Sequence, residues 1–368
     1  MKRTGGARPV FVAGLPEIDG LAVRRFDQEG DYARVAELLR VVNAHDGVDW
    51  LPTAETLRND WTHSDGLDLG EDIIVAETGD VTVAYAEHSW RVRGGSVVHD
   101  LHVAVTPAAR GRGLGRALLG WAEGRVTSGL AAGGLGADLG IPQVLSGWAD
   151  LEIPGVLPWA TAAGYQVAGY GLTMTRPLSD PMPDVELPPG LEVRPVRPEQ
   201  HRAIWDADAE AFQDHRDPGL RTDADYEGWF SQPDLDTSLW LVAWDGDDVA
   251  GSVLNFVYAE ENARLGVRRG WLEHVSVRRP WRRQGLASAL ITRSLRLLRA
   301  LDLDEAALGS DAENLSGAVH IYEALGFRRA RTAAHYRKPI EALDPGAPLP
   351  GVPRPGPGPA IAPCPDES

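Results

Sequence analysis

The chain has 368 residues, of which 43% are hydrophobic and 24% are charged, and its formal net charge is −17. The length suits two domains of about 150 to 180 residues, and the composition is typical of a soluble globular protein. The acidic balance disfavours nucleic acid as a partner, and no apolar run reaches the roughly 18 residues needed to cross a membrane. With no signal-peptide core near Met1 and a single cysteine, Cys364, we expect a cytoplasmic protein with no internal disulfide and no metal site.

Three short segments of the chain occur twice, at offsets of 170, 172 and 162 residues. The pairs are Leu21–Arg25 with Leu191–Pro195, Arg110–Gly115 with Arg282–Ala287, and Gly164–Tyr165 with Gly326–Phe327. Repetition at a long and nearly constant offset indicates two copies of one domain.

The proline content marks the limits of the two copies. Residues 177–190 contain five prolines and residues 342–368 contain nine. Because proline fixes φ and cannot donate a hydrogen bond to a neighbouring strand, neither segment is expected to form regular structure. We therefore predict an extension over residues 1–20, a first domain over 21–176, a linker over 177–190, a second domain over 191–341 and a disordered tail over 342–368.

The pattern of apolar residues predicts a similar order of strands and helices in each copy. In the second copy, an opening strand over 191–196 precedes helical segments that end at Phe212 and Phe230. The other expected elements are strands over 238–244 and 249–257 joined by a hairpin turn at Asp245–Asp248, a central strand over 270–277, a helix over 286–301, a strand over 305–309, a helix over 316–325, and two closing strands over 327–331 and 334–337. This order predicts an α/β fold, with a mixed sheet covered by helices.

A short loop rich in glycine and arginine joins the central strand to the long helix in both copies. Its residues are Arg282, Arg283, Gln284, Gly285, Leu286 and Ala287 in the second copy, and Arg110, Gly111, Arg112, Gly113, Leu114 and Gly115 in the first. Free backbone N–H groups favour an anion at a helix start, and glycine lets a phosphate approach the backbone. The loop predicts a phosphate site, although a capped turn with solvated arginines is the alternative. It matches neither the dinucleotide fingerprint nor the Walker A motif.

Each loop belongs to a longer pattern. Arg-x-x-Gly-x-Gly or Ala follows a valine-rich strand end, and in the second copy Asn314 and the segment Tyr322–Phe327 follow about 30 residues later. Over residues 21–340 the pattern resembles the GNAT superfamily of acetyl-CoA-dependent N-acyltransferases, and the duplication resembles its two-domain, mycothiol synthase-like members. The resemblance implies acetyl-CoA as co-substrate. It also implies two domains, each with a twisted, mostly antiparallel sheet, a splayed central strand pair and flanking helices.

The resemblance assigns roles to the matching positions. In the second copy, the backbone of Val275 and Val277 would pair with the pantetheine arm, residues 282–287 would hold the pyrophosphate, and Asn314 would contact the pantetheine or its path. Tyr322 would donate a proton to the departing thiolate, with packing between helix and sheet as the alternative. In the first copy the corresponding CoA ligands are Val103, Val105 and residues 110–115.

Glu273 is the candidate general base. Strict alternation along the strand gives it the same face as Val275 and Val277, and puts His274 on the opposite face, where it packs or meets solvent. An amine arrives mostly as ammonium and must lose a proton before it attacks a thioester, and a carboxylate near the acetyl group can accept that proton. The alternative is a surface acid on a half-exposed strand.

The first copy lacks both proton-transfer candidates at the matching positions. Leu101 stands at the position of Glu273, and Ala160 stands at the position of Tyr322. Asp100 and His102 face the other way unless a bulge shifts the register. We therefore expect a degenerate first domain that supports an active second domain, and leave open whether the first binds CoA.

The opening helices of the second copy are expected to contact the acceptor. Residues 205–217, Trp229 and Phe230 are rich in acids and aromatics, which suit a cationic amine but also describe a solvated helix face. The favoured function is acetyl transfer from acetyl-CoA to a primary amine of a small molecule, without a covalent acyl-enzyme. A non-catalytic CoA-binding module and a protein lysine acetyltransferase are the alternatives. The sequence indicates neither the acceptor, nor the acyl chain length, nor the oligomeric state.

Overall fold

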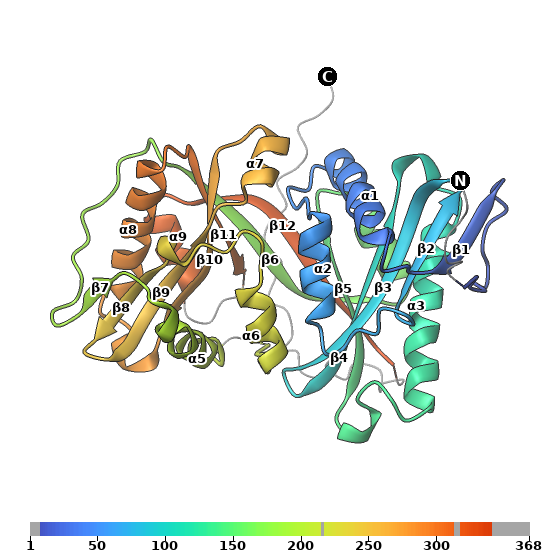
Figure 1. Cartoon of the computed structure of the whole chain (residues 1–368), viewed down its shortest axis with the longest axis horizontal. Coiled ribbons are helices and arrows are strands. Elements are labelled where there is room, and N and C mark those ends of the chain that lie inside the picture. Colours follow the sequence, from blue (N-terminus) through green and yellow to red (C-terminus); the bar gives the residue numbers. More distant parts are fainter. Residues whose placement is uncertain (1–7, 215–216, 313–316, 341–368) are drawn as a thin grey trace.

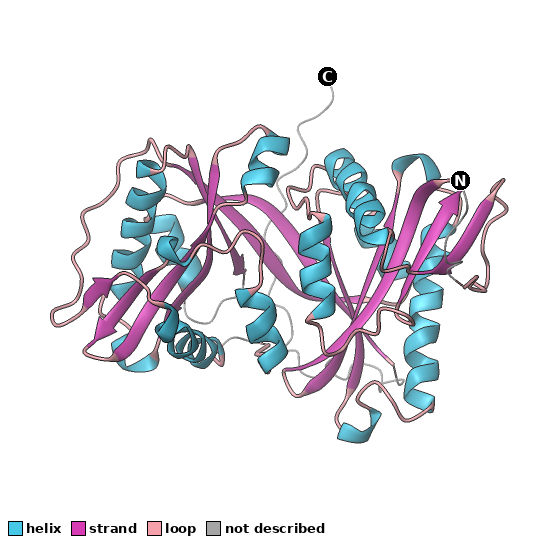
Figure 2. Ribbon diagram, viewed as in Figure 1, coloured by secondary structure: helices cyan, strands magenta, loops and turns pink. Residues whose placement is uncertain are grey.

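The computed structural model describes residues 8–214, 217–312 and 317–340. The named strands of this part form one mixed, twelve-stranded sheet with helices on both faces (Figures 1 and 2). The first repeat contains β1 (Leu21–Arg25), α1 (Asp31–Asp46), α2 (Ala54–Thr62), β2 (Ile73–Thr78), β3 (Val81–Arg93), β4 (Ser96–Val105), α3 (Leu114–Ala131), β5 (Gln143–Asp150), α4 (Val156–Ala162) and β6 (Gln166–Pro177).

The second repeat follows the same order with one additional helix, α7, which the sequence pattern did not predict. It contains β7 (Glu192–Arg194), α5 (His201–Phe212), α6 (Asp223–Phe230), β8 (Leu241–Asp245), β9 (Asp248–Phe256), α7 (Ala259–Leu265), β10 (Arg269–Val277), α8 (Leu286–Ala300), β11 (Glu305–Asp311), α9 (Ala318–Ala324) and β12 (Arg328–Pro339). The mixed α/β sheet and the duplicated order of elements are therefore confirmed.

The two repeats exchange their last strands: each last strand pairs with a strand of the other repeat. The strand order is β1-β2-β3-β4-β5-β12-β6-β11-β10-β9-β8-β7. β12 pairs with β5 of the first repeat, β6 pairs with β11 of the second, and β6 and β12 pair with each other in the middle of the molecule (Figure 1). The prediction of two short closing strands was wrong, because β12 is one strand that pairs along two neighbours.

Apolar side chains on both faces of each half attach the helices to the sheet. In the first half, α1 packs over β2 and β3 through Val35 and Leu39, and α3 covers the opposite face through Leu118. In the second half, α5 packs through Ile204 on the face that corresponds to α1, and α8 packs through Leu290 on the other. Each half is therefore a sheet between two helical layers.

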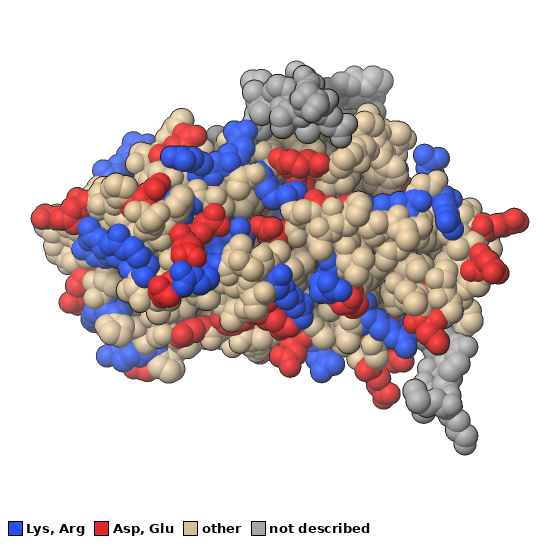
Figure 3. Space-filling view, turned by 90° about the horizontal axis from the view of Figure 1, so that it is seen from above, with Lys and Arg blue, Asp and Glu red and all other residues tan. Residues whose placement is uncertain are grey.

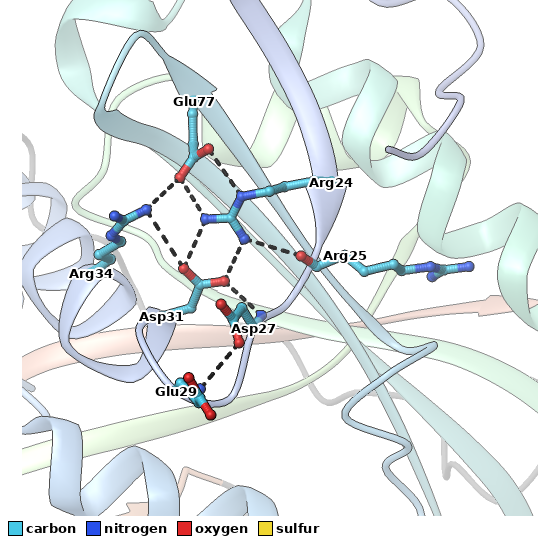
Figure 4. Close-up of polar contacts among 7 residues, drawn as sticks. All are labelled: Arg24, Arg25, Asp27, Glu29, Asp31, Arg34 and Glu77. Atoms are coloured by element: carbon cyan, nitrogen blue, oxygen red, sulfur yellow. Dashed lines mark hydrogen bonds and ion pairs between the residues drawn. The ribbon is translucent and has the colours of Figure 1, made fainter. Parts of the chain in front are cut away.

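A buried ion cluster fixes the edge strand β1 (Figure 4). The guanidinium of Arg24 donates to both oxygens of Asp31 on α1, at 2.5 and 2.8 Å, and to both oxygens of Glu77 on β2, at 3.0 and 2.5 Å. Arg34 adds an ion pair to Glu77 at 2.8 Å. Because the Asp31 side chain is only 1% exposed, loss of a partner would leave a buried, unpaired charge.

The proline-rich segment over residues 178–190 has no helix or strand, but it is packed against the second half. Leu178 is buried in the core beneath α8, Arg293 donates to the carbonyl of Val185 at 3.0 Å, and Arg296 donates to that of Pro183 at 3.2 Å. The predicted tail over 342–368 lies outside the described residues, and the predicted domain limits remain a prediction.

The two halves meet along α2 and α6, which lie side by side in the middle of Figure 1. The side-chain amide of Asn59 donates to the carbonyl of Gly228 at 2.9 Å, and Asp49 pairs with Arg269 of β10 at 2.6 Å. Acidic and basic side chains are interspersed over the face shown in Figure 3. Among the described helices, none combines the length and the hydropathy needed to span a membrane.

Candidate active site

The central parallel strands of each half pair at one end only. The pairing of β10 with β11 stops at Trp271 and Ala307, and that of β4 with β5 stops at Asp100 and Ser146. β10 goes on pairing with β9 through Val277 on its other side. The splayed strand pair that the resemblance implied is confirmed, and it leaves an open edge of β10 beside the predicted cofactor residues Val275 and Val277.

The loops after these strands have the same backbone conformation in both halves. Gly111 and Gly113 have φ values of 75° and 92°, and Arg283 and Gly285 have φ values of 59° and 85°. No atom outside the chain neighbours lies within 4 Å of where a Cβ of Gly113 or Gly285 would be. Both glycines therefore leave the first N–H groups of α3 and α8 open to an approaching anion.

The side chains of the loop divide into anchors and exposed groups. Leu114 and Leu286 are each 1% exposed and fix the helix start in the core, so that they can offer a ligand only backbone groups. The exposed side chain of Arg283 makes no hydrogen bond or ion pair with any described residue. Its charge is thus available to an anion at the helix start.

The first arginine of each loop is instead occupied within the protein. Arg282 donates through Nε to the carbonyl of Val277 at 2.8 Å and through a terminal nitrogen to Asp214 at 2.5 Å. Arg110 donates to the carbonyl of Val105 at 3.0 Å and to Asp46 at 2.7 and 2.6 Å. These contacts tie the end of the central strand to the first long helix of each half, which positions the loop.

The acidic residues that open the second repeat also hold this region together. Glu210 accepts from Arg278 at 2.9 Å, and hydrogen bonds from Arg279 and Arg282 hold the pKa of Asp214 well below its usual range. Asp208 is 1% exposed and pairs with Nδ1 of His274 at 2.7 Å. These three acids therefore bind β10 and its loop, and an acceptor-binding role for residues 205–217 stays a prediction.

Glu273 lies at a β-bulge, where it has no partner on β9. Leu272 pairs with Asn255 and His274 with Leu254, so one residue is inserted between them. The expectation of strict alternation was wrong. Val275 and Val277 pack against the core beneath α8, as Leu272 does, whereas a bulge re-aims the side chain of the inserted residue.

The carboxylate of Glu273 accepts a hydrogen bond from the hydroxyl of Tyr258, at 2.8 Å. Tyr258 packs against the cluster formed by α5, β8 and β9, so Glu273 faces the side of the sheet that α5 covers. Burial raises the pKa of Glu273, and the hydrogen bond from Tyr258 opposes that rise. Tyr258 could not be identified from the sequence, because it follows β9 and belongs to no motif.

Tyr322 lies on α9 and is 6% exposed. It belongs to the core against which Val275 and Val277 pack, and its ring meets Phe327 edge-on at 6.1 Å. Burial raises the pKa of the Tyr322 phenol to about 12, so the phenol is protonated at neutral pH. Asn314 lies outside the described residues.

The comparisons with known proteins cover both repeats. The model of the acetyltransferase (GNAT) family matches residues 35–129 and 201–327. Mycothiol acetyltransferase of Geodermatophilus obscurus is 30% identical over 323 residues, which span 86% of this chain and 96% of the relative. That of Salinispora tropica is 34% identical over 238 residues, which span 64% of this chain and 71% of the relative.

Two solved structures align along most of the chain. A GCN5-related N-acetyltransferase from Sphaerobacter thermophilus has a TM-score of 0.65 and 28% identity, covering 91% of this chain and 99% of that one. A tandem GNAT protein from the clavulanic acid biosynthesis pathway has a TM-score of 0.61 and 15% identity, covering 88% of this chain and 100% of that one, and shares the fold alone. Because the family model matches each repeat separately, the chain belongs to the GNAT family, as an N-acetyltransferase built from two tandem repeats.

Proposed function

We propose that this protein transfers the acetyl group of acetyl-CoA to a primary amine of a small molecule, and that the reaction takes place in the second half. The observation that carries the proposal is the half-buried carboxylate of Glu273 at the bulge of β10. It lies on the strand whose open edge leads to the anion-binding loop before α8. The proton acceptor and the proposed binding edge for the thioester thus lie on the same strand, β10.

The loop and the splayed strands suit acetyl-CoA as the donor. The pyrophosphate would meet the N–H groups at the start of α8 and the charge of Arg283. The pantetheine arm would then run along the open edge of β10, past Val277 and Val275, toward the bulge. A backbone N–H of that edge would polarise the acetyl carbonyl.

The reaction needs three proton transfers. Glu273 takes a proton from the ammonium, and the neutral nitrogen then attacks the thioester carbonyl and forms the C–N bond. As the C–S bond breaks, Tyr322 gives its proton to the departing sulfur, and the second proton that the nitrogen releases restores the phenol. With a phenol pKa of about 12 against about 8.5 for a thiol, the transfer from Tyr322 to the sulfur is uphill until the bound cofactor makes the phenol more acidic.

The relatives support a small-molecule acceptor, since their name, mycothiol acetyltransferase, refers to a small thiol. A lysine side chain of a protein is the alternative acceptor, and no observation on this chain favours it. A ternary complex is proposed because the sole cysteine, Cys364, lies in the proline-rich tail, and none of the described residues offers a thiol to carry the acetyl group.

The test is an amine panel that includes small amines and lysine peptides, with acetyl-CoA turnover followed by release of free thiol. Glu273→Gln is expected to lower kcat by about 10²- to 10⁴-fold, which is the range for a lost general base. Tyr322→Phe is expected to lower kcat with little change in the affinity for acetyl-CoA.

Two matched variants serve as controls. Glu260→Gln changes an exposed acid of the neighbouring helix α7, and Tyr336→Phe changes another buried tyrosine, on β12. Both are expected to keep the wild-type rate. Full rates in both Glu273→Gln and Tyr322→Phe would refute the assigned roles.

A further inference from the structure

The central strands of the two halves have the same register when they are aligned through their loops. Val105 pairs with Ala84, and Val277 pairs with Gly251. Three residues further back, His102 pairs with Glu87, whereas His274 pairs with Leu254. The first half thus has a carboxylate at a position where the second half has a leucine.

Glu87 and His102 lie on the face of the sheet that α1 and α2 cover. Residues directly opposite each other on antiparallel strands project to the same face. Nδ1 of His102 lies 2.5 Å from the hydroxyl of Tyr85, which packs beneath α1 and α2. Burial raises the pKa of the Glu87 carboxyl to about 7, and the nearby Trp61 of α2 opposes that rise. Burial lowers the pKa of His102 to about 4, so this imidazole is neutral at physiological pH.

Two exposed tryptophans flank His102. The ring centroids of Trp50 and Trp148 lie 6.2 and 6.5 Å from that of His102, and the two residues are 37% and 51% exposed. Trp148 lies on β5 beyond the last residue that pairs with β4, so it borders the open gap of the first half. Aromatic faces attract a cationic amine.

The gap in the first half leads to the same kind of loop as in the second. The loop at Arg110–Gly115 has the backbone conformation of the loop before α8, and Arg112 is exposed with no hydrogen bond or ion pair to any described residue. A pantetheine arm that ran from this loop back along β4 would pass Val105 and Val103 and carry its thioester to the level of His102.

We propose that the first half is a second acetyl-transfer site, which takes a cationic primary amine and uses Glu87 as its proton acceptor. Glu87 removes one proton from the ammonium, and the nitrogen attacks the thioester carbonyl and forms the C–N bond. The C–S bond then breaks, the sulfur leaves with its electron pair, and it takes up the second proton that the nitrogen releases. This site is slower than the one in the second half, because Ala160 stands where Tyr322 would protonate the sulfur.

The full-length double variant Glu273→Gln, Tyr322→Phe isolates this activity. Its release of free thiol from acetyl-CoA is measured over a panel of small amines. We expect a residual rate that saturates with the amine and that falls about 10²-fold when Glu87→Gln is added. Glu87→Asp should retain part of that rate, and Trp50→Ala should raise the KM for the amine.

The control is Glu55→Gln in the same double-variant background, because Glu55 is an exposed acid of α2. It is expected to leave the residual rate unchanged, and equal melting temperatures exclude misfolding of the Glu87 variants. The proposal is overturned if the double variant releases no thiol above the buffer rate, or if Glu87→Gln leaves the residual rate intact. A double variant that keeps the full wild-type rate, and loses it with Glu87→Gln, would instead refute the proposed role of the second half.

Discussion

The raised pKa of Glu273 suits a proton acceptor but lowers the stability of the folded protein once the carboxyl ionises. The Glu273 carboxyl is half-buried and receives a hydrogen bond from Tyr258, yet its pKa is raised. The folded protein therefore binds this proton more tightly than the unfolded chain does. The contribution of Glu273 to stability is then greatest below its ordinary pKa and falls as the pH rises through the raised value. Above that raised pKa, the ionised carboxylate lowers the free energy of unfolding.

This linkage gives Glu273→Gln two opposite effects. At pH 7 its melting temperature should equal or exceed that of the wild type, because glutamine does not ionise, while kcat falls. For the wild type, kcat/KM should decrease toward acid pH with an apparent pKa above that of a free glutamate, and this acid limb should be absent from the variant. Calorimetry and a pH–rate profile measure both effects. A large loss of stability in Glu273→Gln would indicate a structural carboxylate instead.

The two arginines that begin the second loop are expected to differ. Arg283→Ala should raise the KM for acetyl-CoA by about tenfold, the effect of one charged contact to a phosphate, and leave the melting temperature unchanged. Arg282→Ala should lower the melting temperature, because it removes the hydrogen bonds that link Val277 of β10 to Ala211 of α5 and to Asp214. Thermal unfolding and initial rates on both variants check this contrast, and identical effects would contradict it.

The sequence pointed to Glu273 but could not predict its surroundings. A carboxylate on a valine-rich strand before a phosphate loop is a local signal, whereas the contact with Tyr258 depends on how β9 and β10 pair. The bulge has no local signal either, so alternation assigned Glu273 to the wrong face. Glu87 was missed for the same reason, because its position opposite His102 follows from a register between two strands.

At the scale of elements, each loop and the helix after it form one unit that we expect to bind an anion. Gly285 and Gly113 end their loops with positive φ at the N-cap of a long helix. Alanine at either position costs about 1–2 kcal/mol of backbone strain and places a methyl group where the phosphate would approach. The two units are equivalent in backbone conformation, so both are expected to bind acetyl-CoA.

Calorimetric titration tests this equivalence. The wild type should bind two acetyl-CoA molecules per chain, and Gly285→Ala and Gly113→Ala should each weaken one of the two sites. The double variant should bind neither molecule tightly. A stoichiometry of one in the wild type, abolished by Gly285→Ala and unaffected by Gly113→Ala, would show that the first loop is only a turn.

Most helices and strands could be predicted because their signals are local. The hairpin turn at Asp245–Asp248 and the apolar face of α8 are examples, and α6 was predicted to its last residue. β12 could not be predicted as one strand, because it lies between β5 and β6, and these neighbours are more than 150 residues away in the sequence.

At the scale of the whole molecule, the exchange of β6 and β12 makes the repeats interdependent. Without the second repeat, the strand β5 would be an exposed edge of the first half, and β6 would lack both of its neighbours, β12 and β11. Exposed edges of this length promote aggregation. The duplication visible in the sequence therefore yields two copies of a fold that are completed only by each other.

The strand exchange predicts that neither repeat folds alone but that both stay together once folded. Fragments 1–190 and 191–368, expressed separately, should be aggregated or lack a cooperative unfolding transition, and their coexpression should restore a soluble complex with acetyl-CoA turnover. The matched control is the intact chain with a protease site placed between Pro183 and Gly190 and cleaved after folding. Its two pieces should elute together in gel filtration and separate only in denaturant, since β6 and β12 remain paired across the cut. A soluble fragment 1–190 with a sharp unfolding transition would show that β12 is not needed to complete the first half.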